Sequence, residues 1–554
     1  MLCVWLTFSS ALWGQALVGP EQLKPRTISG LVVNSLTDQP ISHALVQFGQ
    51  RAVLTDTEGH FELTDVNGYG VPSATKPGYF PEDIGPAVMS SPPADSQSGP
   101  VEIRLVPEAI VSGHVTDSGG EPLEGIPVSL RTLAVSNGLK YWQTRNSATT
   151  NAEGEFRIAE LPAGEYAIQT SFTQDGAPDG EAAAGYVPVN YPVMGANGAG
   201  ALKIHAGDHL EVDLSTHLEP LYPVPIAVSG APEHRWSNFT VRTADGAEIN
   251  PSLRRNPETG EVRMFLPSGT FELRVEGFEP APNSGNQLGG TGVNPVRLFA
   301  SRSVTVTQGQ ANHLQLTLEP MATVGVEISQ EKVATTANPQ SPAMPPEGPR
   351  SSAEQAPPIG IGLVSTESDR YPTAYYAERP GAPAHFNRGT VADGPLLIHN
   401  LPPGKYMLQA QTQPPWYVAS ALCGGTDLTR EPLVIAGSAG GCTISVVLRD
   451  NTSSMKLSVS GGSGTAIAYI YAIPLGNLTR DTQTFTTSSD GRASLDGLPP
   501  GQYLLLAMRY SAQLAFRDPE SLRRYETLGK RVELAPGGGA DVQLDAVDEE
   551  PQPQ

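Results

Sequence analysis

Apolar and polar residues alternate over short stretches of this chain. The alternation is clearest at 101–105, 210–214, 314–318, 444–448 and 542–544. A period of two residues is typical of β-strands that bury one face. Such runs recur at intervals of about 8–12 residues, with turn residues between them, which is typical of β-sandwiches. The pattern therefore predicts an all-β chain.

A longer motif recurs along the chain. A turn that contains Gly is followed six or seven residues later by Leu-Pro-x-Gly-x-Tyr/Phe, at 161–166, 266–271, 401–406 and 498–503. Gly supplies a positive φ in the turn, and Pro-x-Gly turns the chain again. We expect the Leu to enter a core and the aromatic residue to open the next strand. Tyr166, Tyr406 and Tyr503 are therefore predicted to be core residues. The start of the chain keeps only the first half of the motif, at 55–61.

The repeats divide the chain into about five units. We expect a tandem array of Ig-like or transthyretin-like β-sandwich domains at 26–107, 108–219, 220–320, 321–450 and 451–547. The third and fourth units are divergent. The fourth contains an insertion at 331–358 that is rich in Pro, Ala, Ser and Gln and too poor in apolar residues to fold. An acidic tail is expected at 548–554.

Composition and charge exclude several classes of protein. Gly and Pro number 58 and 51 among 554 residues, which rules out a helical bundle or a coiled coil. Lys and Arg number 35 against 57 Asp and Glu, a net charge of −22. A surface this negative repels phosphate, so nucleic acid is not an expected partner.

The N-terminus is typical of an export signal. Residues 2–13 are uncharged and mostly apolar, and the small-x-small triplet 14–16 follows, so we expect a signal peptide at 1–16. No basic residue precedes the run. A first core strand is the alternative, because a membrane anchor needs about 20 apolar residues. Export predicts a secreted, periplasmic or cell-surface protein with no transmembrane segment. In an exported chain, we expect Cys423 and Cys442 either to form a disulfide or to remain two buried thiols.

These residues resemble the carboxypeptidase regulatory-like domain, a transthyretin-like β-sandwich grouped with carbohydrate-binding-like folds. The first two units carry the resemblance best, at 28–30 with 55–61 and at 111–115 with 151–166, and the last unit shares it. The stretch 422–429, followed by the last unit, resembles large secreted proteins common in soil bacteria such as acidobacteria. The resemblance implies a fold and no activity.

The sequence offers little catalytic chemistry. No His has a Glu three positions on, as a zinc carboxypeptidase would need, and no nucleophile elbow, phosphate-binding loop or convincing helical stretch is found. Asp56, Glu58, Asp393 and Asp490 lie in predicted turns that offer one or two oxygens each, whereas Ca²⁺ takes about six to eight. We therefore expect no catalytic residues, no cofactor and no metal.

Binding is the expected function, with polysaccharide as the favoured ligand. Trp142, in what reads as a long loop-like insertion, and Tyr375 with Tyr376 are the candidate aromatic residues, because a planar ring stacks on a sugar face. The alternatives are a structural or adhesive spacer that holds envelope proteins, and an accessory to a separately encoded exported enzyme or transporter.

Overall fold

The structure, a computed structural model, describes most of the chain between residues 26 and 547. The segments outside the described residues within that range are 67–70, 83–99, 176–183, 193–200, 231–235, 244–247, 257–260, 280–295, 309–312, 334–357, 367–371, 379–388, 391–395, 438–440, 461–467 and 510. The expected signal peptide, the acidic tail and most of the Pro-rich insertion therefore lie outside the description. The described residues up to Pro107 form one compact unit, and those from Glu108 onward form another.

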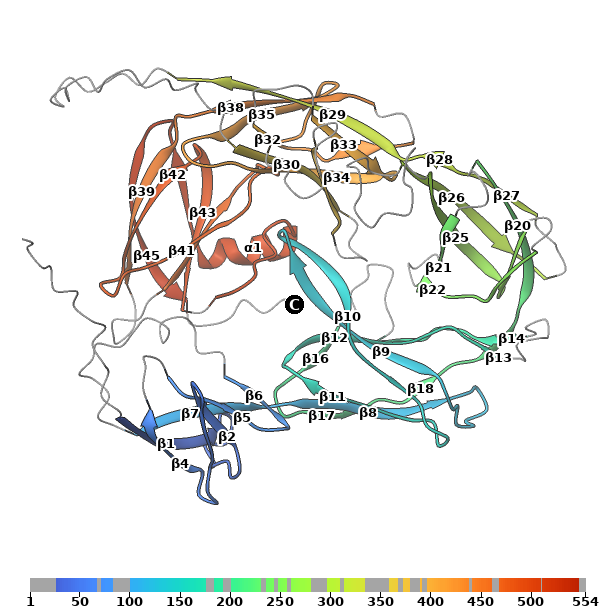
Figure 1. The fold of residues 1–554 in the computed structure, drawn as a ribbon, viewed down its shortest axis with the longest axis horizontal. Coiled ribbons are helices and arrows are strands. Elements are labelled where there is room, and N and C mark those ends of the chain that lie inside the picture. Colours follow the sequence, from blue (N-terminus) through green and yellow to red (C-terminus); the bar gives the residue numbers. More distant parts are fainter. Residues whose placement is uncertain are drawn as a thin grey trace, which may run out of the picture. The chain divides into compact units, whose positions relative to one another are not determined.

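Nearly all regular structure is β, which confirms the predicted fold class. The strands fall into five consecutive groups, which we call sandwiches 1 to 5, and Figure 1 colours them in chain order from blue to red. Sandwich 1 pairs the sheet β4-β1-β7-β6 with the sheet β3-β2-β5. Its strands are β1 (Arg26–Asn34), β2 (Leu45–Phe48), β3 (Arg51–Leu54), β4 (His60–Val66), β5 (Ser73–Thr75), β6 (Tyr79–Pro81) and β7 (Val101–Pro107).

Sandwich 2 pairs the sheet β10-β9-β12-β15, with β16 beside β12, with the sheet β11-β8-β17 and β18; a small sheet, β13-β14-β19, adjoins them. Its strands are β8 (Ala109–Thr116), β9 (Pro127–Ser136), β10 (Leu139–Thr149), β11 (Glu155–Leu161), β12 (Gly164–Thr170), β13 (Thr173–Asp175), β14 (Ala184–Tyr186), β15 (Asn190–Tyr191), β16 (Leu202–Ile204), β17 (His209–Glu211), β18 (Leu214–Ser215) and β19 (Leu218–Pro220).

Sandwich 3 pairs the sheet β23-β24-β20-β27 with the sheet β22-β21-β25-β26-β28. Its strands are β20 (Tyr222–Ser229), β21 (Trp236–Thr243), β22 (Glu248–Ile249), β23 (Leu253–Arg255), β24 (Val262–Leu266), β25 (Gly269–Glu279), β26 (Val296–Val306), β27 (Leu314–Thr317) and β28 (Glu319–Pro320).

Sandwich 4 pairs the sheet β33-β29-β38-β35-β36 with the sheet β31-β30-β34-β37 and β32. Its strands are β29 (Ala322–Glu331), β30 (Pro358–Ser365), β31 (Ala374–Tyr376), β32 (Gly389–Thr390), β33 (Leu396–Leu401), β34 (Gly404–Gln411), β35 (Tyr417–Cys423), β36 (Thr426–Asp427), β37 (Leu433–Ile435) and β38 (Thr443–Arg449).

Sandwich 5 is built from one continuous sheet, β41-β40-β43-β45-β39-β42, with β44 beside β43. Its elements are β39 (Ser453–Ser460), β40 (Tyr469–Pro474), β41 (Gln483–Thr486), β42 (Arg492–Leu498), β43 (Gly501–Met508), α1 (Pro519–Leu528), β44 (Lys530–Leu534) and β45 (Gly539–Val547).

The five sandwiches share one topology. The opening strand (β1, β8, β20, β29 or β39) pairs antiparallel with the strand that follows the Gly turn, and parallel with the closing strand of the same unit. Each sandwich has its own buried core of alternating aliphatic residues. The alternating runs of the sequence therefore end up as the paired inner faces of the sheets.

The close approach of the parallel closing strand explains why two positions of the opening strands are glycine. A Cβ built on Gly30 would lie 2.0 Å from the carbonyl oxygen of Val101, and one built on Gly113 would lie 1.9 Å from that of Val212. Real Cβ atoms do not approach oxygen this closely, so only Gly lets the two backbones come together at this point.

The Tyr of the recurrent motif is tied to its own turn. The hydroxyls of Tyr166, Tyr406 and Tyr503 donate to the carbonyls of the Pro four residues earlier at 2.7, 2.6 and 2.7 Å. The three rings are almost fully buried, at 1–2% exposure. The motif thus anchors the Pro-x-Gly turn to the core by packing and by one hydrogen bond.

Helix α1 differs from the expectation that the sequence holds no convincing helix. Asp518 caps it by accepting from the backbone N–H of Ser521 at 2.9 Å, and Pro519 opens the first turn. An N-cap Asp followed by Pro is a recognised start signal. The helix was missed because it is short and buries only Ser521 and Tyr525, which gives it a weak apolar face.

Candidate functional site

The three candidate aromatic residues are placed differently from one another. Trp142 lies in β10, not in a loop as expected, and is half-buried with the Arg131 guanidinium 6.0 Å from its ring. Tyr375 packs against the core of sandwich 4, edge-on to Tyr406 at 5.9 Å. Tyr376, the next residue in β31, points to the opposite face and is 51% exposed. Trp142 and Tyr376 belong to different sandwiches, and only Tyr376 offers a largely open ring.

The two cysteines are joined within sandwich 4. Cys423 ends β35, Cys442 directly precedes β38, and their Cα atoms lie 5.5 Å apart in a disulfide. The bond links neighbouring strands that are already paired, since Cys423 lies opposite Ile444 in the ladder.

The acidic turn residues that the sequence weighed as calcium ligands are engaged by their own backbone. Asp56 accepts from the N–H groups of Glu58 and His60 at 2.9 and 2.8 Å. Asp490 accepts from the N–H of Arg492 at 3.3 Å. Asp393 lies outside the described residues. Side-chain oxygens used in this way form the turn itself.

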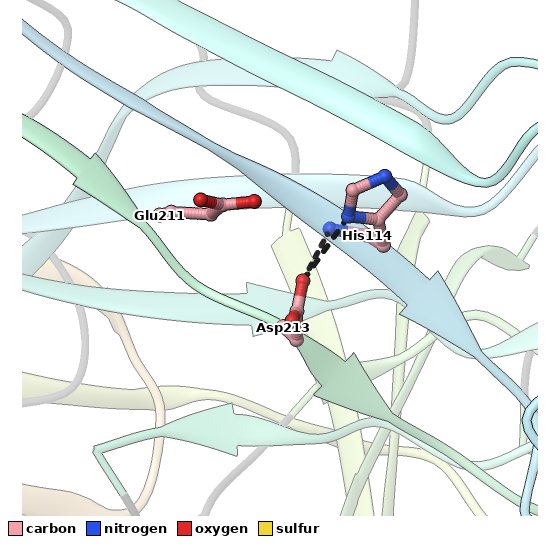
Figure 2. Close-up of side chains that lie close together, drawn as sticks. All are labelled: His114, Glu211 and Asp213. Carbon is pink, nitrogen blue, oxygen red and sulfur yellow. Dashed lines mark hydrogen bonds and ion pairs between the residues drawn. The ribbon is translucent and has the colours of Figure 1, made fainter.

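One cluster of potential metal ligands was not anticipated from the sequence. The imidazole of His114 and the carboxylates of Glu211 and Asp213 offer ligand atoms that all lie within 4.8 Å of one another. Figure 2 shows Asp213 beside the His114 ring, with Glu211 further along the closing strand. His114 Nδ1 lies 3.2 Å from Asp213 Oδ1, and its Nε2 lies 3.8 Å from Glu155 Oε1.

Strand register brings this His114 cluster together. β17 runs parallel to β8 with Glu211 opposite Ser112, which places Asp213 next to His114. Because the residues are about 100 positions apart and the pairing is non-local, no spacing in the sequence could reveal it. The sequence signal for this cluster was the pair of carboxylates, Glu211 and Asp213, that face outward on the closing strand.

A His and two carboxylates suit first-row divalent metals. However, the side chains stand on an open sheet face, and Asp213 already accepts from the His114 backbone N–H at 3.1 Å.

A polar cavity of about 420 Å³ is lined by strands of sandwich 3 and by Pro403, Ala436 and Gly437 of sandwich 4. Its wall includes Glu272, Arg274, Ser301 and Arg302. Burial alone raises the pKa of Glu272, but hydrogen bonds from Arg274 and Ser301 outweigh it and hold that pKa below its usual value. Glu272 is therefore ionised and already paired with Arg274. This cavity wall is therefore polar and carries a preformed ion pair.

Sandwich 2 contains the residues that match a known protein family. Residues 110–192 match the family of carboxypeptidase regulatory-like domains. This chain contains a carboxypeptidase regulatory-like domain. The matched residues span β8 to β15, so the regulatory-like domain holds His114, Trp142 and the Tyr166 anchor.

Several solved structures are distantly similar to the chain. The Bacillus anthracis TIE protein is 12% identical, over 76% of this chain and 68% of that one, with a TM-score of 0.15. GBS52, the minor pilin of Streptococcus agalactiae, is 13% identical over 35% and 95%, with a TM-score of 0.18. BcpA, the major pilin subunit of Bacillus cereus, is 12% identical over 62% and 99%, with a TM-score of 0.14. Similarity at this level says nothing about what this chain does.

No curated protein matches the chain. Among the described residues, no helix has the length and apolar character needed to cross a membrane.

Proposed function

We propose that this chain is an exported, non-enzymatic scaffold built from repeated β-sandwiches. The observation that carries the proposal is the role of the residues that recur. Gly30 and Gly113 admit the closing strand, and the motif tyrosines anchor their turns. What the repeat preserves thus serves folding. Tyr503 does line a cavity of about 240 Å³, but its hydroxyl is used to anchor its own turn through Pro499.

Export is part of this proposal. It rests on the apolar, uncharged run at 2–13 followed by a small-x-small triplet, and on the paired cysteines. Disulfides persist in oxidising compartments and are rare in the cytosol. The expected partners of such a scaffold are other proteins of the cell envelope, held by the faces of the sandwiches.

Saccharide binding is a second candidate function, favoured by one observation. The exposed ring of Tyr376 lies over Gly362, where an added Cβ would be 3.0 Å from the ring. A glycine beneath an exposed ring holds it flat against the sheet, which leaves its outer face open for stacking on a sugar. Trp142 is a weaker candidate because it is half-buried and faces Arg131.

A glycan screen on residues 17–554 separates the two functions. Scaffolding predicts no saturable retention on a broad polysaccharide panel, and envelope proteins recovered by pull-down. Saccharide binding predicts retention that Tyr376→Ala abolishes. Tyr375→Phe is the matched control, because it keeps the neighbouring core ring and leaves the exposed one untouched. A reproducible hydrolase activity of the pure protein would overturn the non-enzymatic proposal.

A further inference from the structure

The regulatory-like domain carries a hairpin that is much longer than its counterpart in sandwich 1. β9 and β10 have 10 and 11 residues and are joined by the two-residue turn Asn137–Gly138. The corresponding hairpin of sandwich 1, β2–β3, has 4 residues in each strand. The additional length does not add to the core cluster of sandwich 2, to which this hairpin contributes the buried Val128 and Leu130 and the partly buried Ala148. Tyr141, further out in the hairpin, is buried outside that cluster. The additional length therefore requires another explanation.

The tip of this hairpin is bound by sandwich 5. The backbone N–H of Arg517 donates to the Gly138 carbonyl at 2.9 Å, and the Arg517 guanidinium donates to the Asn137 carbonyl. The same guanidinium also reaches the carbonyls of Leu478 and Arg480, at 2.9 and 3.1 Å. The Arg517 side chain is only 6% exposed. A buried cation needs such partners, and the hairpin tip supplies one of them.

Shape reinforces the polar contacts. Gly138 has a φ of +75°, and a Cβ built there would lie 2.5 Å from the ring of Phe516. Gly138 is thus required for two reasons. The turn needs a residue with positive φ, and the Phe516 ring leaves no room for a side chain. The Arg517 guanidinium lies 4.7 Å from the centre of the same ring.

Two further side chains flank the tip. Lys140 pairs with Asp518, the N-cap of α1, at 3.2 Å, and these side chains are 16% and 27% exposed. Gln409 of sandwich 4 donates to the Asn137 side-chain oxygen at 3.3 Å and to Asp481 at 2.9 Å. The receptor for the tip is therefore assembled from residues of sandwiches 4 and 5.

We propose that the Asn137–Gly138 tip is an intramolecular latch, and that Gln409 with Phe516–Asp518 forms its receptor. The latch ties the regulatory-like domain to sandwiches 4 and 5 across 272 to 380 positions of sequence. The occupant of the receptor is the chain's own hairpin. The latch couples the regulatory-like domain to sandwiches 4 and 5, so that a load or a partner taken up by the regulatory-like domain is also borne by sandwich 5.

Zero-length cross-linking and hydrogen exchange on the full chain test the latch. A carbodiimide is expected to join Lys140 to Asp518, both of which are partly accessible. Gly138→Asn retains a residue that tolerates positive φ but places a side chain against Phe516. We expect it to abolish the cross-link and to speed exchange of the Arg517 amide at least tenfold. Gly425→Asn is the matched control, since Gly425 has a φ of +95°, the same second position in a two-residue turn, and open space around it.

Phe516→Ala is a second variant that leaves the hairpin itself intact. It should also speed hydrogen exchange of the Arg517 amide. The proposal is overturned if the wild-type chain gives no Lys140–Asp518 cross-link and the Arg517 amide exchanges equally fast in all four proteins. Mixing isotopically light and heavy chains tests the occupant. Cross-links within one chain support the latch, whereas mixed-mass cross-links would show that the tip binds a second copy and would overturn the intramolecular assignment.

Discussion

The hydrogen bond of the recurrent Tyr gives a graded prediction of stability. Tyr503 donates to Pro499 in a fully buried bond, whereas the bonds of Tyr166 and Tyr406 are partly buried. Replacing Tyr by Phe keeps the ring and removes the hydroxyl, which leaves the Pro carbonyl unpaired. A net hydrogen bond contributes about 1 kcal/mol, and a buried orphan acceptor costs about 1–3 kcal/mol. We therefore expect Tyr503→Phe to lose about 2 kcal/mol and Tyr166→Phe about 1 kcal/mol.

Hydrogen exchange, strand by strand, is the appropriate assay, because a multidomain chain does not unfold in two states. A loss of about 2 kcal/mol corresponds to roughly 30-fold faster opening. The faster exchange should be confined to the sandwich that carries the substitution. Tyr376→Phe is the control, since its ring is 51% exposed. Equal exchange in Tyr503→Phe and Tyr376→Phe would refute the anchoring role of the motif. Phe271, which replaces Tyr in sandwich 3, shows that packing alone can fill the position.

Three further outcomes are expected. Gly113→Ala should destabilise the regulatory-like domain by more than about 2 kcal/mol, measured as faster hydrogen exchange of its strands, whereas Gly437→Ala, with no atom near the added Cβ, should leave the exchange of sandwich 4 unchanged; unchanged exchange in Gly113→Ala would contradict the close-approach argument. Non-reducing peptide mass spectrometry should find Cys423 linked to Cys442, and free thiols in protein purified from its native host would remove that support for export. Burial alone raises the pKa of Asp518, but hydrogen bonds to its carboxylate lower it below the ordinary 3.8. Its contribution is thus present above that value and lost as pH falls through the folded pKa. Protection of the Arg517 amide, measured relative to its intrinsic exchange rate, should therefore weaken in acid, and protection that stays constant through that range would count against the pair.

Local patterns were sufficient for the sandwich architecture. Alternation located strands, and the Gly-turn and Leu-Pro-x-Gly-x-Tyr signals located turns, because each signal depends on residues a few positions apart. The buried state of Tyr166 followed from the same reasoning and is confirmed at 1% exposure. The reason for Gly113 did not follow, since its neighbour Val212 is reached only through the parallel closing strand.

Candidate sites were harder to predict, and for two different physical reasons. The cluster of His114, Glu211 and Asp213 depends on a strand register that joins residues about 100 positions apart. Trp142 was assigned to a loop because the polar residues around it interrupt the alternation. Yet Asn137–Gly138 is among the strongest short-range hairpin signals, and it would have placed Trp142 in a strand.

Departures from the repeat are therefore more informative about specific roles than the repeat itself. A residue that recurs in every sandwich meets a requirement that every sandwich has, such as a turn or a core position. The long hairpin of the regulatory-like domain occurs where sandwich 1 has a short one, and its extra residues contact Arg517 and Phe516 instead of their own core. In a chain of similar modules, such unequal elements are where one module can recognise another, and the Asn137–Gly138 tip meets that description in sequence and in contacts.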